Sequence, residues 1–330
     1  MLPSYEETLP EDIPETAAVE NTGQKPEPFS RFWYDNYYGV SDLSDLLDYI
    51  NDASIKTLML RDCTFTDLSP LSRLPELETL SILDNPHISD LSPLSSLENL
   101  KILLLDELPH IESIAPLSTL VNLRYLRLEY SDVYFRELVP LQNLEKLYLG
   151  SYGEIVDFTY ISQLQSLKRF SISPIYPFSI THFNASTYSN TFKEMQNVEK
   201  LGDLINLESL GVSTPMIEDT MPEFFPRNFD ISWIIALQKL REFSLNHSSI
   251  DDISPLAELP NLAEVDLYQT RVKDITPLLK SKSIKKIWRP ITANSETDDP
   301  DYPSTIITNL YRQFEERGID FSIFFRNDNR

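Results

Sequence analysis

The chain has 330 residues, a length that suits either two ordinary domains of about 150 residues or one elongated repeat architecture. Its 28 basic and 51 acidic side chains give a net charge of −23, which repels nucleic-acid phosphates and anionic membrane surfaces. The chain has only 7 glycines, which disfavours glycine-rich phosphate loops. It has no run of about 18 to 20 apolar residues, which argues against membrane insertion.

The first 28 residues are predicted to form a flexible acidic tether. From Met1 to Gln24 there are six acidic residues, no basic residue and three prolines. Such a segment buries too little apolar area to offset its ordering entropy. The start lacks a basic region followed by an apolar core, so two locations stay open. The protein is at the cell surface or secreted if an export signal has been removed, and cytoplasmic otherwise.

Residues 29–54 are predicted to cap the front of the structure. Ser41 is expected to begin a helix that carries Leu43, Leu46, Leu47 and Ile50 on one stripe. An aromatic run precedes this helix and consists of Phe32, Trp33, Tyr34, Tyr37 and Tyr38. These rings are expected to wrap the cap, because large rings beside a sheet edge gain more by covering it than by facing water. A recognition segment is the alternative.

From residue 55 to residue 290 one pattern repeats. The string DLSPLSRLPELETLSILDN at Asp67 recurs as DLSPLSSLENLKILLL at Asp90 and as DISPLAELPNLAEVDL at Asp252. Its period of 22 residues lies within the range of leucine-rich repeats, and the three-residue leucine spacing predicts 3₁₀ or extended turns between strands. Ten parallel strands are expected, centred on Leu58, Leu80, Leu103, Leu126, Leu147, Phe170, Leu210, Phe243, Val265 and Ile287.

This pattern resembles the bacterial internalin-like leucine-rich repeats and the related repeats of a phosphatase regulatory subunit. Both share the 22-residue period and the D-I/L-x-P-L segment, and the resemblance covers about Ile55 to Pro290. It implies an α/β solenoid, a leucine-rich-repeat horseshoe whose parallel sheet binds protein ligands on its concave face. Such families stack asparagines at the turn position, where only Asn85 conforms here. Buried turn amides must therefore find other partners, and irregular curvature is expected.

The 22-residue period breaks twice. The spacing is 40 residues from Ile172 to Val212 and 33 residues from Val212 to Leu245, which places insertions near 176–195 and 216–230. Both leave just after a strand and should emerge at the same edge of the solenoid. Aromatic residues in them are candidates for a rim of the binding surface, namely Tyr176, Phe178, Phe183, Phe224 and Phe225. Packing of these rings into a small satellite core is the alternative.

The C-terminal part is predicted to cover the last repeat. An acidic linker spans 291–303, and residues 304–330 form a cap. In this cap a helix runs from about Ser304 to Arg317, and Gly318 is placed to end it. Alternating apolar residues from Ile319 onward predict a half-buried strand.

Groups that could support catalysis or metal binding are few. The sequence has none of the common nucleophile, zinc-protease or phosphate-loop motifs, so no catalytic residue and no cofactor is expected. His87 and His110 hold equivalent positions in adjacent repeats, but two imidazoles are too few for a zinc site. Cys63 lies at the turn position and is expected to be a buried structural residue.

Strand alternation sends the repeat leucines inward and their neighbours onto the concave face. A basic and aromatic group is expected there, in a chain that is otherwise acidic, and consists of Tyr125, Arg127, Lys146, Tyr148 and Arg169. Arginine and tyrosine are the residue types that protein interfaces concentrate. Acidic Glu242, Glu264 and Asp266 follow on later strands. Ion pairing with Glu129 and general solubility form the alternative explanation.

These features predict a non-enzymatic, monomeric protein-interaction module that binds a protein or peptide on its concave face. The alternative is a receptor for a small ligand or glycan in a pocket formed by the aromatic insertions. No metal, cofactor or nucleic acid is expected in either case.

Overall fold

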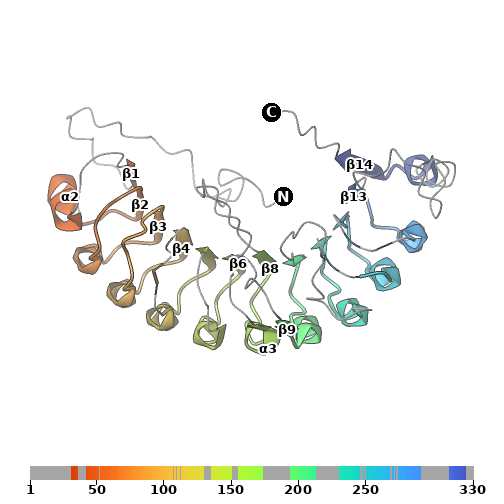
Figure 1. Cartoon of the computed structure of the whole chain (residues 1–330), viewed down its shortest axis with the longest axis horizontal. Coiled ribbons are helices and arrows are strands. Elements are labelled where there is room, and N and C mark those ends of the chain that lie inside the picture. Colours follow the sequence, from red (N-terminus) through yellow and green to blue (C-terminus); the bar gives the residue numbers. More distant parts are fainter. Residues whose placement is uncertain are drawn as a thin grey trace, which may run out of the picture. The chain divides into compact units, whose positions relative to one another are not determined.

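The computed structural model divides the chain into two compact units, Met1–Leu123 and Arg124–Arg330. In each unit short parallel strands alternate with 3₁₀ turns (Figure 1). The structure describes residues 31–35, 42–51, 53–106, 108, 110–111, 113–129, 135–150, 155–173, 194–212, 230–245, 248, 250–267, 270, 272, 274–290 and 312–324. The predicted tether (1–28) and acidic linker (291–303) lie outside these residues.

The first unit is a parallel sheet in the order β1-β2-β3-β4. Its strands are β1 (Arg31–Asp35), β2 (Thr57–Arg61), β3 (Thr79–Leu83) and β4 (Ile102–Asp106). The 3₁₀ turns are η1 (Ser69–Arg73), η2 (Ser92–Ser96) and η3 (Ala115–Thr119). The edge of β2 pairs with β1, so Phe32, Trp33 and Tyr34 of the aromatic run cover this edge as a strand, while Tyr37 and Tyr38 lie outside the described residues.

Helix α2 (Leu43–Ile50) precedes β2 and contacts η1. Its predicted apolar stripe is buried, because Leu43, Leu46, Leu47 and Ile50 are each at most 8% exposed. The predicted N-cap is wrong by one residue. Asp42 is the cap, and its Oδ1 accepts a hydrogen bond of 2.7 Å from the backbone N–H of Ser44. A carboxylate at this position also interacts favourably with the positive end of the helix dipole.

The second unit carries a parallel sheet in the order β5-β6-β8-β10-β11-β12-β13-β14. Its strands are β5 (Tyr125–Glu129), β6 (Lys146–Gly150), β8 (Arg169–Ser173), β10 (Ser209–Val212), β11 (Glu242–Ser244), β12 (Glu264–Asp266), β13 (Lys286–Pro290) and β14 (Asp320–Phe324). The connections contain η4 (Phe135–Leu138), α3 (Phe158–Ile161), η5 (Val198–Asp203), η6 (Ser232–Ala236), η7 (Ser254–Glu258) and η8 (Thr276–Lys280). All ten predicted strand centres lie in strands, and 3₁₀ turns predominate in the connections as expected.

The repeated D-I/L-x-P-L segment builds η1, η2, η7 and η8. The aspartate accepts the backbone N–H two residues later, at 2.7 Å from Ser69 to Asp67 and 2.8 Å from Ser254 to Asp252. The proline then stands at the start of the 3₁₀ helix, where its missing N–H costs nothing. The leucine that follows is fully buried, as at Leu71. The motif therefore starts these four turns and anchors them in the core.

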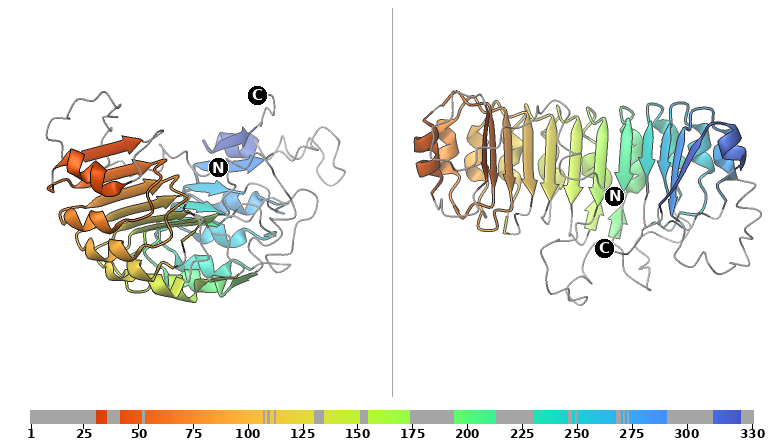
Figure 2. Two further views of the ribbon diagram at one scale, coloured as in Figure 1. Left: turned by 60° about the vertical axis from the view of Figure 1, so that its left-hand side comes forward. Right: turned by 90° about the horizontal axis from the view of Figure 1, so that it is seen from above.

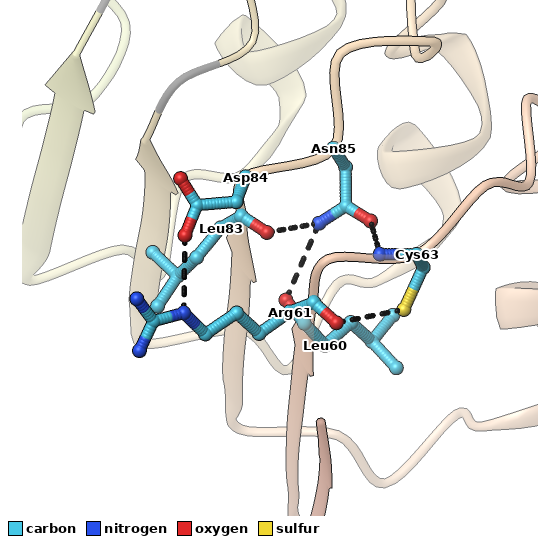
Figure 3. Close-up of polar contacts among 6 residues, drawn as sticks. All are labelled: Leu60, Arg61, Cys63, Leu83, Asp84 and Asn85. Carbon is cyan, nitrogen blue, oxygen red and sulfur yellow. Dashed lines mark hydrogen bonds and ion pairs between the residues drawn. The ribbon is translucent and has the colours of Figure 1, made fainter. Parts of the chain in front are cut away.

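Asn85 holds the turn position in the first unit (Figure 3). Its side-chain Oδ1 accepts a hydrogen bond of 2.8 Å from the backbone N–H of Cys63, and its Nδ2 donates to the carbonyls of Leu60 and Leu83. Cys63 is buried as expected, with its thiol 3.3 Å from the carbonyl oxygen of Arg61. In this turn the amide of one repeat binds the backbone of the preceding repeat.

Other turn positions use hydroxyl groups. Ser248 donates to the carbonyl of Leu245 at 2.8 Å, and Thr270 donates to that of Leu267 at 3.0 Å. A second set of asparagines, which the sequence reasoning missed, lies just before the strands and donates side-chain amides to carbonyls of the preceding repeat. Its described members are Asn99, Asn122, Asn206 and Asn261. The signal was present as an asparagine directly before a repeat leucine.

A small parallel sheet of β7 (Ile155–Asp157) and β9 (Glu194–Gln196) was not predicted. It lies at one side of the main sheet of the second unit (Figure 2). Asp157 joins its two strands, because it accepts hydrogen bonds from Thr159 N and Asn197 Nδ2, both at 2.9 Å. Burial raises the pKa of Asp157, but these hydrogen bonds outweigh it and hold the pKa below its ordinary value. The end of the first predicted insertion is therefore a strand.

At the C-terminus, β14 pairs with β13 as the predicted strand should. Residues 312–316 are helical, whereas the predicted helix start at 304 lies outside the described part. Gly318 ends this helix with φ at +70°, and Ile319 N donates to Phe314 O while Gly318 N donates to Glu315 O. These two bonds form a Schellman motif.

Candidate functional site

The five predicted binding residues gather on one face of the second unit. We call this the open face, meaning the face of the sheet turned away from the 3₁₀ turns. Tyr125 and Arg127 lie on β5, Lys146 and Tyr148 on β6, and Arg169 on β8. The register places Tyr125, Lys146 and Arg169 side by side on three adjoining strands and puts Arg127 opposite Tyr148.

Two of these residues are less accessible than strand alternation predicts. Tyr125 is 3% exposed and Arg127 is 9% exposed, so the expectation that outward positions face water is wrong for both. The rings of Tyr125 and Tyr148 lie with centroids 5.4 Å apart and an interplanar angle of 33°. Large side chains on strands about 4.8 Å apart cover one another in this way. Lys146, Tyr148 and Arg169 stay half-buried.

The hydroxyl of Tyr148 lies in a charged environment. Burial raises its pKa above the ordinary value, whereas the charge of Arg169 and a hydrogen bond from it act in the opposite direction. The net effect keeps this phenol neutral at physiological pH. It can then both donate and accept hydrogen bonds.

Arg169 forms an ion pair that crosses a strand. Its Nη1 lies 3.4 Å from Oε2 of Glu242 on β11, and the two side chains are 42% and 44% exposed. Strand β10 lies between β8 and β11, with Ser209 in the same row. The short serine side chain leaves room for the two long side chains to meet above it. The sequence analysis placed Glu242 in an acidic group and missed this ion pair. The side chain of Glu129, the expected partner of the basic residues, lies outside the described part of the chain.

Side chains of like charge lie next to each other at two places in this row, before Lys286 follows Glu264 on β13. Lys146 lies directly opposite Arg169, and Glu242 lies directly opposite Glu264. Like charges directly opposite each other destabilise a sheet. Within the described part of the chain Lys146 makes no ion pair.

The neighbouring row, formed by the residues directly before these strands, has alternating charges. Glu145 lies between two cations, 2.9 Å from Arg124 and 2.6 Å from Lys168. Hydrogen bonds from Lys168 and Arg124 lower the pKa of Glu145 despite partial burial. The first unit has an equivalent group, in which Glu78 binds Lys56 and Lys101. Charges of opposite sign are therefore paired directly beside Lys146 and Arg169, which carry the same sign.

Comparison with known proteins bears on the fold. The model of the family described as "Leucine Rich repeats (2 copies)" matches residues 53–96. An internalin (inlF) of Listeria monocytogenes superposes with a TM-score of 0.51 at 21% identity, over 86% of this chain and 83% of that chain. This chain is a leucine-rich-repeat protein. Its fold is internalin-like. No curated protein sequence matches it significantly.

Two other solved structures have similar repeats. The internalin C2 of Listeria monocytogenes has a TM-score of 0.47 and 23% identity, over 74% of this leucine-rich-repeat protein and 83% of that chain. A leucine-rich-repeat protein of Leptospira interrogans has a TM-score of 0.40 and 19% identity, over 79% of this chain and 74% of that chain.

The open-face group does not account for every predicted site residue of this leucine-rich-repeat protein. The rim candidates Tyr176, Phe178, Phe183, Phe224 and Phe225 lie outside the described residues. Their segments begin after Ser173 and Val212, at the ends of the adjacent parallel strands β8 and β10. His87 and His110 are exposed, and the described residues contain no group of three potential metal ligands. No described helix has the length and apolar character to span a membrane.

Proposed function

We propose that this protein is a non-enzymatic interaction module that binds a protein or peptide on the open face of the second unit. Leucine-rich-repeat folds commonly provide extended binding surfaces, and the chemistry of the surface decides what they bind. Here the surface offers the half-buried ring of Tyr148 and two half-buried cations, and the buried side chains of Tyr125 and Arg127 lie beside them. Tyrosine and arginine dominate binding energies at protein interfaces.

The opposition of Lys146 and Arg169 carries this proposal. If these residues served only solubility, alternating charges would serve as well and would avoid the repulsion. The residues directly before strands β5, β6 and β8 show this alternation, in the row of Glu145. An acidic or polar partner would relieve the repulsion between the two cations, because it would place negative charge between them.

Other expectations stay predictions. A bacterial origin, a cell-surface location, a monomeric state and the absence of nucleic-acid binding are each untested. The alternative function, a small-ligand or glycan pocket in the aromatic insertions, depends on residues outside the described part of the chain.

Selection of displayed random 12-residue peptides on the full chain tests the proposal. We expect enriched peptides whose affinity falls at least tenfold on Arg169→Glu, because this variant reverses a charge at the centre of the surface. Arg169 is preferred to Arg127, since an acidic side chain at the buried position 127 would disturb the fold. Lys200→Glu is the matched control, because Lys200 is exposed on η5 away from the open face.

Two outcomes would contradict the proposal. One is the failure of the wild-type chain to enrich any peptide. The other is equal affinity of the enriched peptides for wild type and Arg169→Glu, which would place the binding site elsewhere. Thermal melting of both variants shows whether the fold is unchanged, as expected for surface substitutions within about 0.5 kcal/mol.

A further inference from the structure

We infer that Glu242 is a built-in competitor, which occupies on Arg169 the place that a carboxylate of the bound peptide takes. This inference rests on the proposed function and specifies its ligand as an acidic peptide. It begins with the ion pair that crosses β10, in which Nη1 of Arg169 lies 3.4 Å from Oε2 of Glu242.

This ion pair is loose enough to be exchanged. Hydrogen bonds between a guanidinium and a carboxylate ordinarily have lengths of about 2.7 to 2.9 Å and often use two parallel N–H groups. Here the one contact is longer, at 3.4 Å, and both side chains are more than 40% exposed. An exposed ion pair of this kind favours its closed state by less than about fivefold, so a peptide carboxylate can displace Glu242 from Arg169 at little cost.

The strand order shows why a peptide carboxylate can bind better than Glu242 does. The order β6-β8-β10-β11 puts Lys146 on one side of Arg169 and Glu242 on the other. Glu242 spans two strand spacings, about 9.6 Å, to reach Arg169 alone. A carboxylate that approaches from solvent can instead lie between Arg169 and Lys146 and interact with both cations.

The surroundings define the rest of the ligand. Tyr125 lies on the far side of Lys146 from Arg169, and its ring packs against that of Tyr148. An aspartate or glutamate of the peptide would bind the cations, while an adjacent aromatic or apolar residue contacts the half-buried ring of Tyr148, which packs on the buried ring of Tyr125. We therefore expect the selected peptides to contain an acidic residue next to an apolar one.

Glu242→Gln tests the competition, with Glu264→Gln as the matched control. Both variants remove one negative charge from the same row, but only Glu242 contacts Arg169. At about 0.15 M salt we expect Glu242→Gln to bind the selected acidic peptides about 2 to 5 times more tightly than wild type. Glu264→Gln should increase the affinity for these peptides clearly less. Peptides in which the acidic residue is replaced by its amide should bind both variants and wild type with equal affinity.

A glutarate titration, followed by the ¹⁵N NMR signal of Arg169 Nε, tests the carboxylate site without any peptide. Glu242→Gln should bind glutarate more tightly than wild type and Glu264→Gln. Equal responses of the three proteins would overturn the inference, as would selected peptides that lack acidic residues or bind both variants equally. If glutarate responds as expected while no peptide is enriched, the carboxylate site stands and the proposed function fails.

Discussion

Asn85 satisfies backbone groups that burial removes from water. It is fully buried, and its amide binds the backbone N–H of Cys63 and the carbonyls of Leu60 and Leu83. An unpaired buried donor or acceptor costs its desolvation energy, which is larger than the net gain from an ordinary hydrogen bond. Asn99 makes one similar bond to the carbonyl of Pro75, but it is exposed, so water can replace it.

We therefore expect the two asparagines to respond differently to alanine. Asn85→Ala should lower the free energy of unfolding by about 2 to 3 kcal/mol, and Asn99→Ala by less than about 1 kcal/mol. Denaturant unfolding of both variants measures the difference. Equal losses would mean that the turn around Asn85 relaxes and admits water to its backbone groups.

Arg127 shows where residue-level reasoning from the sequence fails. Strand alternation correctly placed it on the face opposite the repeat leucines. Exposure on that face depends on the side chains of neighbouring strands, and Arg127 is only 9% exposed. Because these neighbours come from other repeats, no local pattern around residue 127 predicts its burial.

At the scale of the element, the repeat motif was sufficient to predict the 3₁₀ turns. In η1, η2, η7 and η8 the capping aspartate, the proline and the buried leucine stand within five residues of one another. They act through local hydrogen bonds, so the 3₁₀ turns follow directly from the sequence. The pairing of β7 with β9 joins residues about 40 positions apart and had no such local signal.

The helix end at Gly318 is also local, and it gives an element-scale prediction. Gly318 has φ at +70°, and nothing lies within 4 Å of the place where a Cβ would stand. Gly318→Ala should therefore lower the free energy of unfolding by about 1 to 2 kcal/mol through backbone strain alone. Gly318→Asn should lose less, because asparagine tolerates the left-handed region.

Denaturant unfolding of these two variants provides the measurement. A loss for asparagine as large as that for alanine would contradict the strain argument. It would indicate instead that any side chain at this position disturbs the cap.

For the whole molecule, stability depends on how the ends of the repeat array are covered. Each repeat is stabilised mainly by its neighbours, and an uncovered strand edge promotes association. At the C-terminal end β14 pairs with β13, and Phe314 and Ile319 are buried. Arg317 adds side-chain hydrogen bonds to the carbonyls of Leu279 and Ser281.

Deletion of residues 304–330 should consequently lower the melting temperature by several degrees and cause self-association, because it exposes the edge of β13. Light scattering and thermal melting test both effects. Deletion of residues 1–28 is the contrasting case, since it ends before β1, and the melting temperature should not change. A C-terminal truncation that stays monomeric and melts unchanged would show that this segment is not a cap.

The sequence alone was sufficient for the repeat architecture, because the period, the leucine positions and the turn motif act within about 22 residues. It also placed Tyr125, Arg127, Lys146, Tyr148 and Arg169 on one face, since alternation along parallel strands is a local property. Only the tertiary structure decided which of these side chains are buried and that Arg169 binds Glu242. Those properties depend on the register of strands up to 73 residues apart in the sequence, and on the small side chain of Ser209 between them.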